Sequence, residues 1–312
     1  MRALVIGAGG FVGQYLTRYL LEEGDEVFGT SMDGNVPGLD AQHSVLLDIT
    51  SPEGCAEVVQ KVRPEVVYHL AGIAFVPEAE ADFGRTLQVN VGGTANVVRQ
   101  CHLLNQGVSL LFISSAEVYG QVPAHTLPIR EEAELRAANN YSLSKRMAEL
   151  VVERYGRAGS LRYTIARPFN HIGPGQDDRF VASNFARQLA SIALRQSPPV
   201  LEVGNLEARR DFSDVRDIVR AYRRIAETGV GVYNLGSGVP RSIQSLLDTL
   251  IAVSGLEVEV RRDPARMRGP EVMELYASTD KAWRECGWRP SISFEQSLED
   301  IYRHWYDRLA KQ

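Results

Sequence analysis

The chain has 312 residues, of which 44% are hydrophobic, so it can bury a substantial core in one large domain or two smaller ones. Its net charge of −5 and its pI near 5.8 argue against a nucleic-acid binder or a membrane-surface protein. The three cysteines (Cys55, Cys101 and Cys286) have no close pairing, no apolar run approaches the ~20 residues of a membrane span, and the first apolar run stops at Ile6. These features predict a cytoplasmic protein without a metal cluster.

Short β-rich runs alternate with amphipathic segments over the first 168 residues. We expect strands at 3–6, 26–29, 44–47, 65–70, 108–114 and 163–168. The helices expected between them cover 11–22, 53–62, 83–104 and 140–155. Continuous apolar strands separated by helices are typical of a parallel sheet that is covered on both faces.

This alternation breaks after about residue 170 and returns once. A loop "FNHIGPGQ", a helix at 179–195 and a strand in "VLEV" come first, and a helix at 215–227 and a strand "GVYNLG" then return to the first domain. The predicted tail helices lie at 243–253, 281–285 and 294–309. We therefore predict an α/β fold with a doubly wound parallel-sheet domain and a smaller, interleaved α/β substrate domain. The predicted boundaries are 1–168 plus 211–238 for the first and 169–210 plus 239–312 for the second.

Three glycines follow the first strand directly, in "LVIGAGGFVGQYL". Gly7, Gly10 and Gly13 allow a tight turn and a close backbone approach to a pyrophosphate, which the free N–H groups of the next helix would face. A strand, a glycine turn and a helix in this order predict a dinucleotide site, in which we include Phe11 and Val12.

The second and third strands supply candidates for the adenosine end of the dinucleotide. The second strand runs into Thr30 and Ser31. Asp33 follows them, slightly further along the chain than the acid that usually binds the NAD ribose. The two hydroxyls favour NADP(H) over NAD(H), although no arginine follows to bind a 2′-phosphate. Asp48, next to Ile49, is expected either at the adenine amino group or as the cap of the helix that begins near Pro52.

A tyrosine and a lysine stand four positions apart in "NNYSLSKRMAEL". Tyr141 and Lys145 would share one face of a helix, where a nearby ammonium would favour the phenolate and lower the pKa of the phenol. Such a tyrosine can exchange a proton near neutral pH. Ser115 ends the buried strand in "LLFISS", at the sheet edge where ligands bind, and its hydroxyl could contact a substrate carbonyl. A surface helix pair and a turn-forming serine are the structural alternatives.

With these motifs, the sequence resembles the extended short-chain dehydrogenase/reductase superfamily, and within it the bacterial GDP-4-keto-6-deoxy-D-mannose reductases. The resemblance runs from "IGAGGFVG" to "CGWRP" and includes "HLAGIAFVPEA", "ISSAEVYGQVP", "ARPFNHIGPGQ" and "LEVGNLEARRDFSDVRDIV". It implies an NAD(P)H-dependent reduction of the C4 ketone of the GDP-sugar to a GDP-6-deoxyhexose such as GDP-D-rhamnose. It also implies a homodimer formed through the helices at 83–104 and 140–155.

The resemblance assigns roles to individual residues. Ser115, Tyr141 and Lys145 would be the catalytic set. Further cofactor contacts would come from Leu70, Ala71, Gly72, Asn90 and Pro168. The substrate would meet Glu117, Asn170, His171, Arg209, Arg210, Arg268 and Glu271. Gly269 separates Arg268 from the proline that adjoins it in relatives, and a solvated loop is the alternative for the arginines around it.

Three other activities remain compatible with the sequence. Glu117 matches a dehydratase carboxylate, so the activity of a GDP-mannose type 4,6-dehydratase is compatible with the sequence. Ala116, however, stands where dTDP-sugar dehydratases carry an aspartate. A 4-epimerase shares the same framework. A dinucleotide-sensing regulator without catalysis would be expected to have lost Tyr141 or Lys145, and both are present.

Overall fold

The computed structural model describes residues 1–104, 107–157, 161–266 and 272–311. A seven-stranded parallel sheet lies at its centre, in the order β10-β6-β5-β4-β1-β2-β3. Its strands are β1 (Arg2–Ile6), β2 (Glu26–Ser31), β3 (Ser44–Leu46), β4 (Val66–His69), β5 (Ser109–Ile113), β6 (Arg162–Pro168) and β10 (Gly231–Leu235). All seven correspond to strands expected from the sequence.

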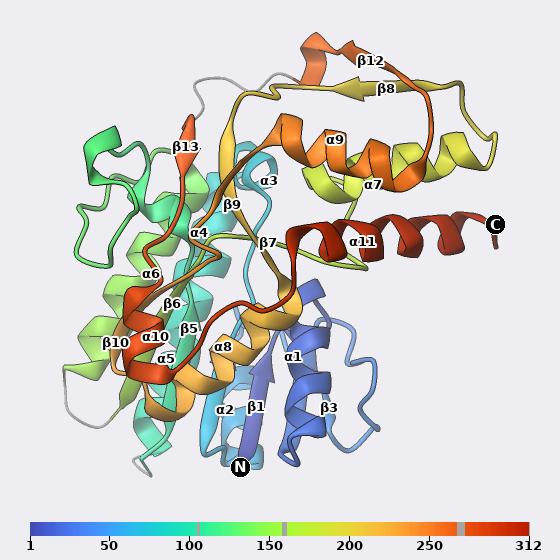
Figure 1. Cartoon of the computed structure of the whole chain (residues 1–312). Helices are drawn as coiled ribbons and strands as arrows, with labels where there is room; N and C mark the ends of the chain where they lie inside the picture. The colour runs from blue at the N-terminus through green and yellow to red at the C-terminus, as the bar shows by residue number, and fades with distance from the viewer. Residues whose placement is uncertain (105–106, 158–160, 267–271, 312) are drawn as a thin grey trace.

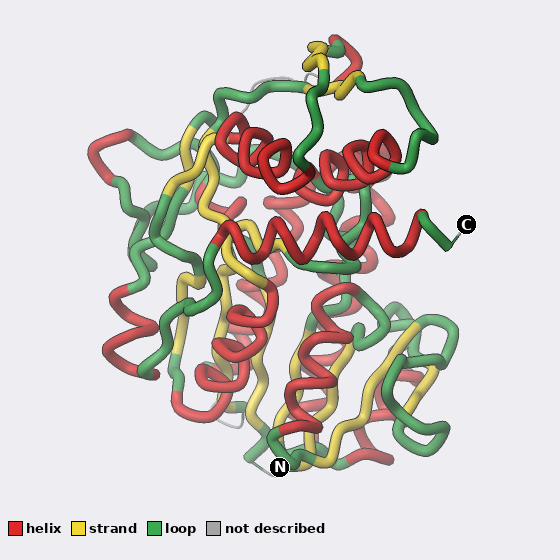
Figure 2. Tube along the Cα trace, turned by 45° about the vertical axis from the view of Figure 1, so that its right-hand side comes forward, coloured by secondary structure: helices red, strands yellow, loops and turns green. Residues whose placement is uncertain are grey.

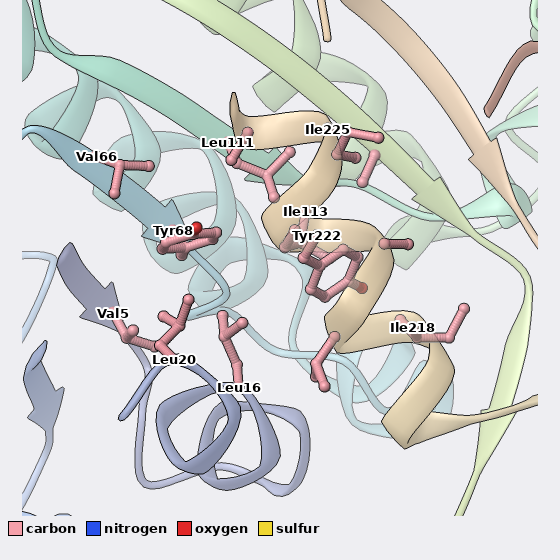
Figure 3. Close-up of a cluster of buried hydrophobic side chains, with 14 of the residues drawn as sticks. Val5, Leu16, Leu20, Val66, Tyr68, Leu111, Ile113, Ile218, Tyr222 and Ile225 are labelled. Atoms are coloured by element: carbon pink, nitrogen blue, oxygen red, sulfur yellow. The ribbon is translucent and has the colours of Figure 1, made fainter. Parts of the chain in front are cut away.

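Helices cover both faces of this sheet (Figure 1). One face carries α1 (Phe11–Glu22) and α8 (Val215–Thr228), and the other carries α2 (Pro52–Val62), α5 (Thr94–Leu104) and α6 (Asn140–Gly156). Figure 3 shows the first interface, where Leu16 and Leu20 of α1 and Tyr222 of α8 meet side chains of the central strands. The sheet is therefore apolar on both sides, which explains why its strands read as continuous hydrophobic runs.

The helix expected at 83–104 is interrupted. It consists of α4 (Phe83–Leu87), a π-helical segment η1 (Gln88–Gly93) and α5. Gly93 packs tightly here, because a methyl group on it would lie 2.5 Å from Ile49 Cδ1. A π-helical turn inserts an extra residue into a helix, often at functional sites. Hydrophobic periodicity does not reveal such an insertion, and it also missed α3 (Val76–Ala81).

A second group of elements packs beyond the sheet edge (Figure 2). Helices α7 (Val181–Ala193), α9 (Ile243–Ser254) and α11 (Phe294–Leu309) share one apolar core. The strands around them are β7 (Asn170–Ile172), β8 (Val200–Val203), β9 (Arg209–Asp214), β11 (Pro240–Ser242), β12 (Glu259–Arg262) and β13 (Glu274–Leu275). Strand β9 pairs with β7, β11 and β13, and β8 pairs with β12.

The predicted division into two domains remains a prediction. Within the stretch 239–312, helix α10 (Asp280–Cys286) packs against α8 and β10, and Ala282 and Trp288 belong to the same core as Leu16 and Leu20. The Trp288 indole N–H donates to the Asp217 carbonyl of α8 at 2.9 Å. This short segment therefore packs with the elements of the parallel sheet. Helices α9 and α11, which precede and follow it in the chain, belong to the other apolar core.

The order of the strands determines where a ligand can bind. Sequential strands spread outward in both directions from β1, with β2 on one side and β4 on the other. The connections after β1 and β4 leave the sheet toward opposite faces, and this opens a crevice at the carboxyl ends of the strands. No helix in the described part of the chain is long and apolar enough to cross a membrane.

Candidate active site

A cavity of about 390 Å³ lies at the carboxyl edge of the sheet, between the two groups of elements. Its wall includes the glycine turn, the loop after β4, the ends of β5 and β6, and α6. The following residues predicted from the sequence line it: Gly7, Gly10, Phe11, Val12, Gly13, Leu70, Gly72, Ser115, Glu117, Tyr141, Lys145, Pro168, Asn170 and His171. The fold thus brings these residues from five separate parts of the chain to one cavity.

The glycine turn has no room for side chains. Gly7 has a φ of +90°, and a methyl group on it would lie 2.8 Å from the Ala71 nitrogen. A methyl group on Gly13 would lie 2.3 Å from the Gly7 carbonyl oxygen. Gly10 is the N-cap of α1 and offers no side chain to the first N–H groups of that helix. A pyrophosphate fits this combination of close backbone approach and helix N-terminus.

Strand β2 ends beside the glycine turn. The Gly7 N–H donates to Thr30 Oγ1 at 3.3 Å, while the Ser31 hydroxyl donates to Asp33 Oδ1 at 2.7 Å. The Asn35 N–H donates to the same carboxylate oxygen at 3.0 Å, and these bonds, that of Asn35 first, lower the pKa of Asp33. The sequence places Asp33 slightly late for the acid that usually binds the NAD ribose; the turn brings its carboxylate back onto Ser31.

Several predicted cofactor residues do not line the cavity. Ile49 is buried in the core under α2 and α5, and the Ala71 N–H donates to the Ile6 carbonyl at 2.9 Å. Asp48 Oδ1 accepts from the N–H and the hydroxyl of Thr50 at 2.9 and 2.8 Å. The expectation that Asp48 caps α2 is wrong, because Ser51 is that cap.

Helix α6 carries the tyrosine and the lysine into the cavity. It begins with a capping box, in which the side chains of Asn139 and Ser142 satisfy each other's backbone N–H groups. The Tyr141 phenol lies within hydrogen-bonding reach of the Ser115 hydroxyl at the end of β5. The Lys145 ammonium donates to the Ile113 carbonyl at 2.8 Å. The two side chains are 8% and 5% exposed, so the alternative of a surface helix pair is wrong.

Burial shifts the pKa values of this pair in a way that the spacing alone did not indicate. Burial raises the pKa of Tyr141 to about 12, although the hydrogen bond from Ser115 acts in the opposite direction. Burial also lowers the pKa of Lys145 to about 8. The expectation that the lysine pulls the phenol pKa down is therefore wrong for this state of the protein, because loss of hydration disfavours the phenolate.

Asn90 fastens the π-helical segment to the cavity wall. Its Oδ1 accepts from the Ile73 N–H at 2.8 Å. Its Nδ2 donates to the Ile73 carbonyl at 3.0 Å and to the Ser144 hydroxyl at 2.9 Å. Because Ser144 adjoins Lys145, these bonds connect the loop after β4 with α6. The π-helical insertion turns Asn90 toward this position.

The predicted substrate residues divide into three groups. Asn170, His171 and Glu117 line the cavity, and the His171 ring stacks on Phe11 at 6.4 Å between centroids. Burial lowers the pKa of His171, so this ring is neutral at pH 7. Asn170 pairs in register with Phe212 of the neighbouring strand β9.

The arginines of β9 lie near the cavity but do not line it. Arg209 pairs with Glu274 at 3.0 Å, and Arg210 is opposite Leu275 of β13, which does line the cavity. Arg268 and Glu271 lie outside the described residues.

Sequence reasoning missed other residues that line the cavity. They are Ala74, Phe75, Val76, Ser114, Phe169, Gln176, Asp177, Phe180, Tyr222 and Leu275, together with Ile113 and Ala116. Gln176 donates to the His171 carbonyl at 3.0 Å and could have been found from its place in "GPGQD". Tyr222 gives no such signal, because it comes from the middle of an amphipathic helix far along the chain.

Comparisons with known proteins agree with this geometry. Residues 4–301 match the GDP-mannose 4,6 dehydratase family. The chain belongs to this family. It is 36% identical to the GDP-6-deoxy-D-mannose reductase of Pseudomonas aeruginosa, over 100% of this chain and 99% of the relative.

Two solved structures of the same superfamily have similar folds. That of RMD from P. aeruginosa complexed with NADPH has a TM-score of 0.86 at 36% identity, covering 99% of this chain and 100% of that one. The Thermus thermophilus UDP-glucose 4-epimerase complex with NAD has a TM-score of 0.85 at 26% identity, covering 98% and 99%. The predicted fold class and the predicted membership of the extended short-chain dehydrogenase/reductase superfamily are confirmed.

Gly13→Ala tests the glycine turn. We expect the free energy of unfolding to fall by about 1–3 kcal/mol, because the new methyl group would collide with the turn, as measured by urea denaturation. Gly92→Ala is the matched control, since the nearest atom to its methyl group would be 4.0 Å away. Equal stability losses in the two variants would contradict this account of the turn.

Proposed function

We propose that this enzyme reduces the C4 ketone of GDP-4-keto-6-deoxy-D-mannose to a GDP-6-deoxyhexose, GDP-D-rhamnose, with NADH or NADPH. The observation that carries the proposal is the buried phenol of Tyr141 beside the Ser115 hydroxyl, in a cavity that begins at a glycine turn. The name of the P. aeruginosa relative, a GDP-6-deoxy-D-mannose reductase, supports the substrate and the direction.

The glycine turn and the start of α1 would hold the cofactor pyrophosphate. Leu70, Gly72 and Pro168 would contact the rest of the dinucleotide from the cavity wall. The nicotinamide, when bound, supplies the hydride for the ketone carbon. Asn170 and His171 would meet the sugar, and Arg209, Arg210, Arg268 and Glu271 its nucleotide.

The protein's own groups would act on the ketone oxygen. The Ser115 hydroxyl donates a hydrogen bond to that oxygen, and Tyr141 gives its phenolic proton to the same oxygen as negative charge develops there. A raised pKa suits this direction of reaction, because the phenol stays protonated at neutral pH until the alkoxide takes its proton. At pH values below its pKa of about 8, Lys145 is an ammonium, and its positive charge stabilises the phenolate that Tyr141 becomes.

Tyr141→Phe tests this role. We expect ketone reduction to fall by about 10²–10⁴-fold because the proton donor is lost, with unchanged cofactor binding. The measurement is reduced-cofactor oxidation with the 4-keto sugar nucleotide, combined with product analysis. Tyr302→Phe is the control, since that half-buried phenol lies on α11, away from the cavity. Full activity of the Tyr141 variant would refute the assignment.

A 4,6-dehydratase is the second candidate, and one observation favours it. Glu117 lines the cavity, and its charge is felt by Tyr141, whose pKa it helps to raise. In a dehydratase this carboxylate would remove the C5 proton or protonate the departing C6 hydroxyl, which leaves as water. The two activities separate cleanly, since a dehydratase consumes GDP-mannose without net cofactor turnover. Conversion of GDP-mannose by the unmodified protein would replace the reductase proposal.

The end of β2 supports a preference for NADH over NADPH. A methyl group on Gly9 would lie 3.0 Å from Ser31 Cβ and 3.7 Å from the Asn35 carbonyl, so the loop that carries Asp33 touches the glycine turn. Between residues 19 and 60 the chain has no lysine or arginine. A ribose 2′-hydroxyl can donate to the Asp33 carboxylate, whereas a 2′-phosphate would be repelled by it.

Asp33→Asn tests this preference. We expect the ratio of kcat/KM for NADPH to that for NADH to rise about tenfold once the repulsion is removed. Asp40→Asn, in the same connection between β2 and β3, should leave the ratio unchanged. A wild-type protein that prefers NADPH, with a ratio indifferent to Asp33, would overturn the preference.

A second copy of the chain is the proposed partner. On α6, Leu143, Met147 and Leu150 are 41%, 36% and 49% exposed and recur at helical spacing, and Leu103 of α5 is 55% exposed. Apolar side chains in such a stripe favour a helix-to-helix contact. The proposed site of the dimer is thus the outer face of α5 and α6.

Leu150→Arg tests the dimer. We expect the molar mass in solution to fall from that of two chains to that of one, because a guanidinium in an apolar contact lacks a partner. Sedimentation equilibrium measures it. Leu21→Arg, on the exposed side of α1, is the control. A variant at Leu150 that keeps the mass of the wild-type protein would argue against this interface.

A further inference from the structure

One turn beyond Lys145, helix α6 carries a carboxylate that is completely buried. Glu149 is 0% exposed, and its two oxygens accept four hydrogen bonds. Oε1 accepts from the Ser114 hydroxyl at 2.6 Å and from Arg167 Nε at 2.8 Å. Oε2 accepts from the other end of the Arg167 guanidinium at 2.8 Å and from Arg146 at 3.0 Å. The Glu149–Arg167 pair is therefore bidentate and dry.

The partners of Glu149 belong to the elements that build the cavity. Ser114 precedes Ser115 at the end of β5, and Arg167 precedes Pro168 at the end of β6. The Lys145 ammonium donates to the carbonyl of Ile113, which directly precedes Ser114. The bonds of Glu149 and Lys145 thus bracket the last residues of β5 and fix α6 to the sheet at the level of the cavity.

The negative charge of Glu149 also acts on Lys145, in addition to the hydrogen bonds that hold α6 in place. Glu149 and Lys145 are four residues apart and lie on one face of α6. Burial lowers the pKa of Lys145, and the negative charge of Glu149 opposes this shift. A neutral lysine would stabilise neither a phenolate nor a bound dinucleotide. The helix thus supplies the compensating carboxylate from a buried position that does not line the cavity.

We propose that Glu149 is a positioning residue for the Tyr141/Lys145 pair: it holds α6 in register with β5 and β6 and supplies the negative charge that keeps Lys145 protonated. The proposal rests on the reductase function given above. A bidentate ion pair with no exposure is costly to bury, and the same volume filled by apolar side chains would stabilise the fold equally well. The placement beside Lys145 gives the retained charge a functional reason.

Other charged and titratable groups face this part of α6. From β4 comes His69, which is neutral at pH 7 because burial and the charge of Lys145 lower its pKa to about 3. Glu117 follows β5 and acts on Tyr141, while Arg167 comes from β6 and is matched by Glu149. Arg146 lies on α6 itself and also contacts Glu153 at 3.2 Å. Within the described chain, Glu149 is the carboxylate whose charge acts on Lys145.

Glu149→Gln keeps the shape of the side chain and removes its charge. Without that charge the ammonium loses its proton at lower pH, so the alkaline limb of the kcat/KM profile for ketone reduction should move down by about one pH unit or more. The pH at which NADH affinity is lost should move by the same amount, measured by nicotinamide fluorescence. Activity on the acid side of the limb should largely remain.

Glu153→Gln is the matched control. This carboxylate lies one turn further along α6 and also pairs with Arg146, yet it does not act on Lys145. Its profile should coincide with that of the wild-type protein. Because Glu149→Gln leaves Arg167 unpaired in the interior, the double variant Glu149→Gln/Arg167→Met is measured in parallel, and it decides the question if the single variant does not fold.

The result that overturns the proposal is a folded variant whose alkaline limb and NADH-binding curve coincide with those of the wild-type protein while kcat falls equally at all pH values. That outcome would make Glu149 a structural residue only. If the wild-type protein binds NADH and does not reduce the ketone, the reductase function fails, and the binding curves of the variants still test the role of Glu149.

Discussion

The whole cavity depends on a helix being held against the carboxyl edge of a parallel sheet at one definite height. Apolar packing alone leaves such a helix some freedom to slide, because the contacts that Ala148 and Val152 make in the core are non-directional. The bidentate contact of Glu149 with Arg167 and the bond of Lys145 to the Ile113 carbonyl remove that freedom. Directional bonds in a dry interior thus set the position of the tyrosine.

The same dry interior explains the protonation of the site. Loss of hydration raises the pKa of Tyr141 and lowers that of Lys145, so both groups move toward their neutral forms. A phenol that holds its proton is suited to quenching a developing alkoxide, and an ammonium at risk of neutralisation needs a nearby negative charge. One low-dielectric environment therefore accounts for both features. It keeps the phenol protonated for the reduction, and it makes the lysine depend on the charge of the buried carboxylate of Glu149.

Beside the glycine turn the balance is reversed, because the carboxylate of Asp33 is exposed. Asp33 is exposed, and bonds from the Asn35 N–H and the Ser31 hydroxyl lower its pKa, so it stays ionised. An exposed carboxylate selects among ligands by charge and hydrogen bonding. The proposed site therefore combines an exposed carboxylate beside the glycine turn for recognition with a buried cavity for proton transfer.

The sequence by itself determined the parallel sheet, its covering helices and the glycine turn, because these follow from local patterns such as continuous apolar strands and missing side chains at Gly7 and Gly13. It also identified Ser115, Tyr141 and Lys145 as candidates through spacing and strand ends. Only the tertiary structure decided that Asp33 returns onto Ser31, that a π-helical turn aims Asn90 at α6, and that Glu149 meets Arg167. These features join residues from separate elements, and the pKa of a side chain depends on everything packed around it, which no local pattern records.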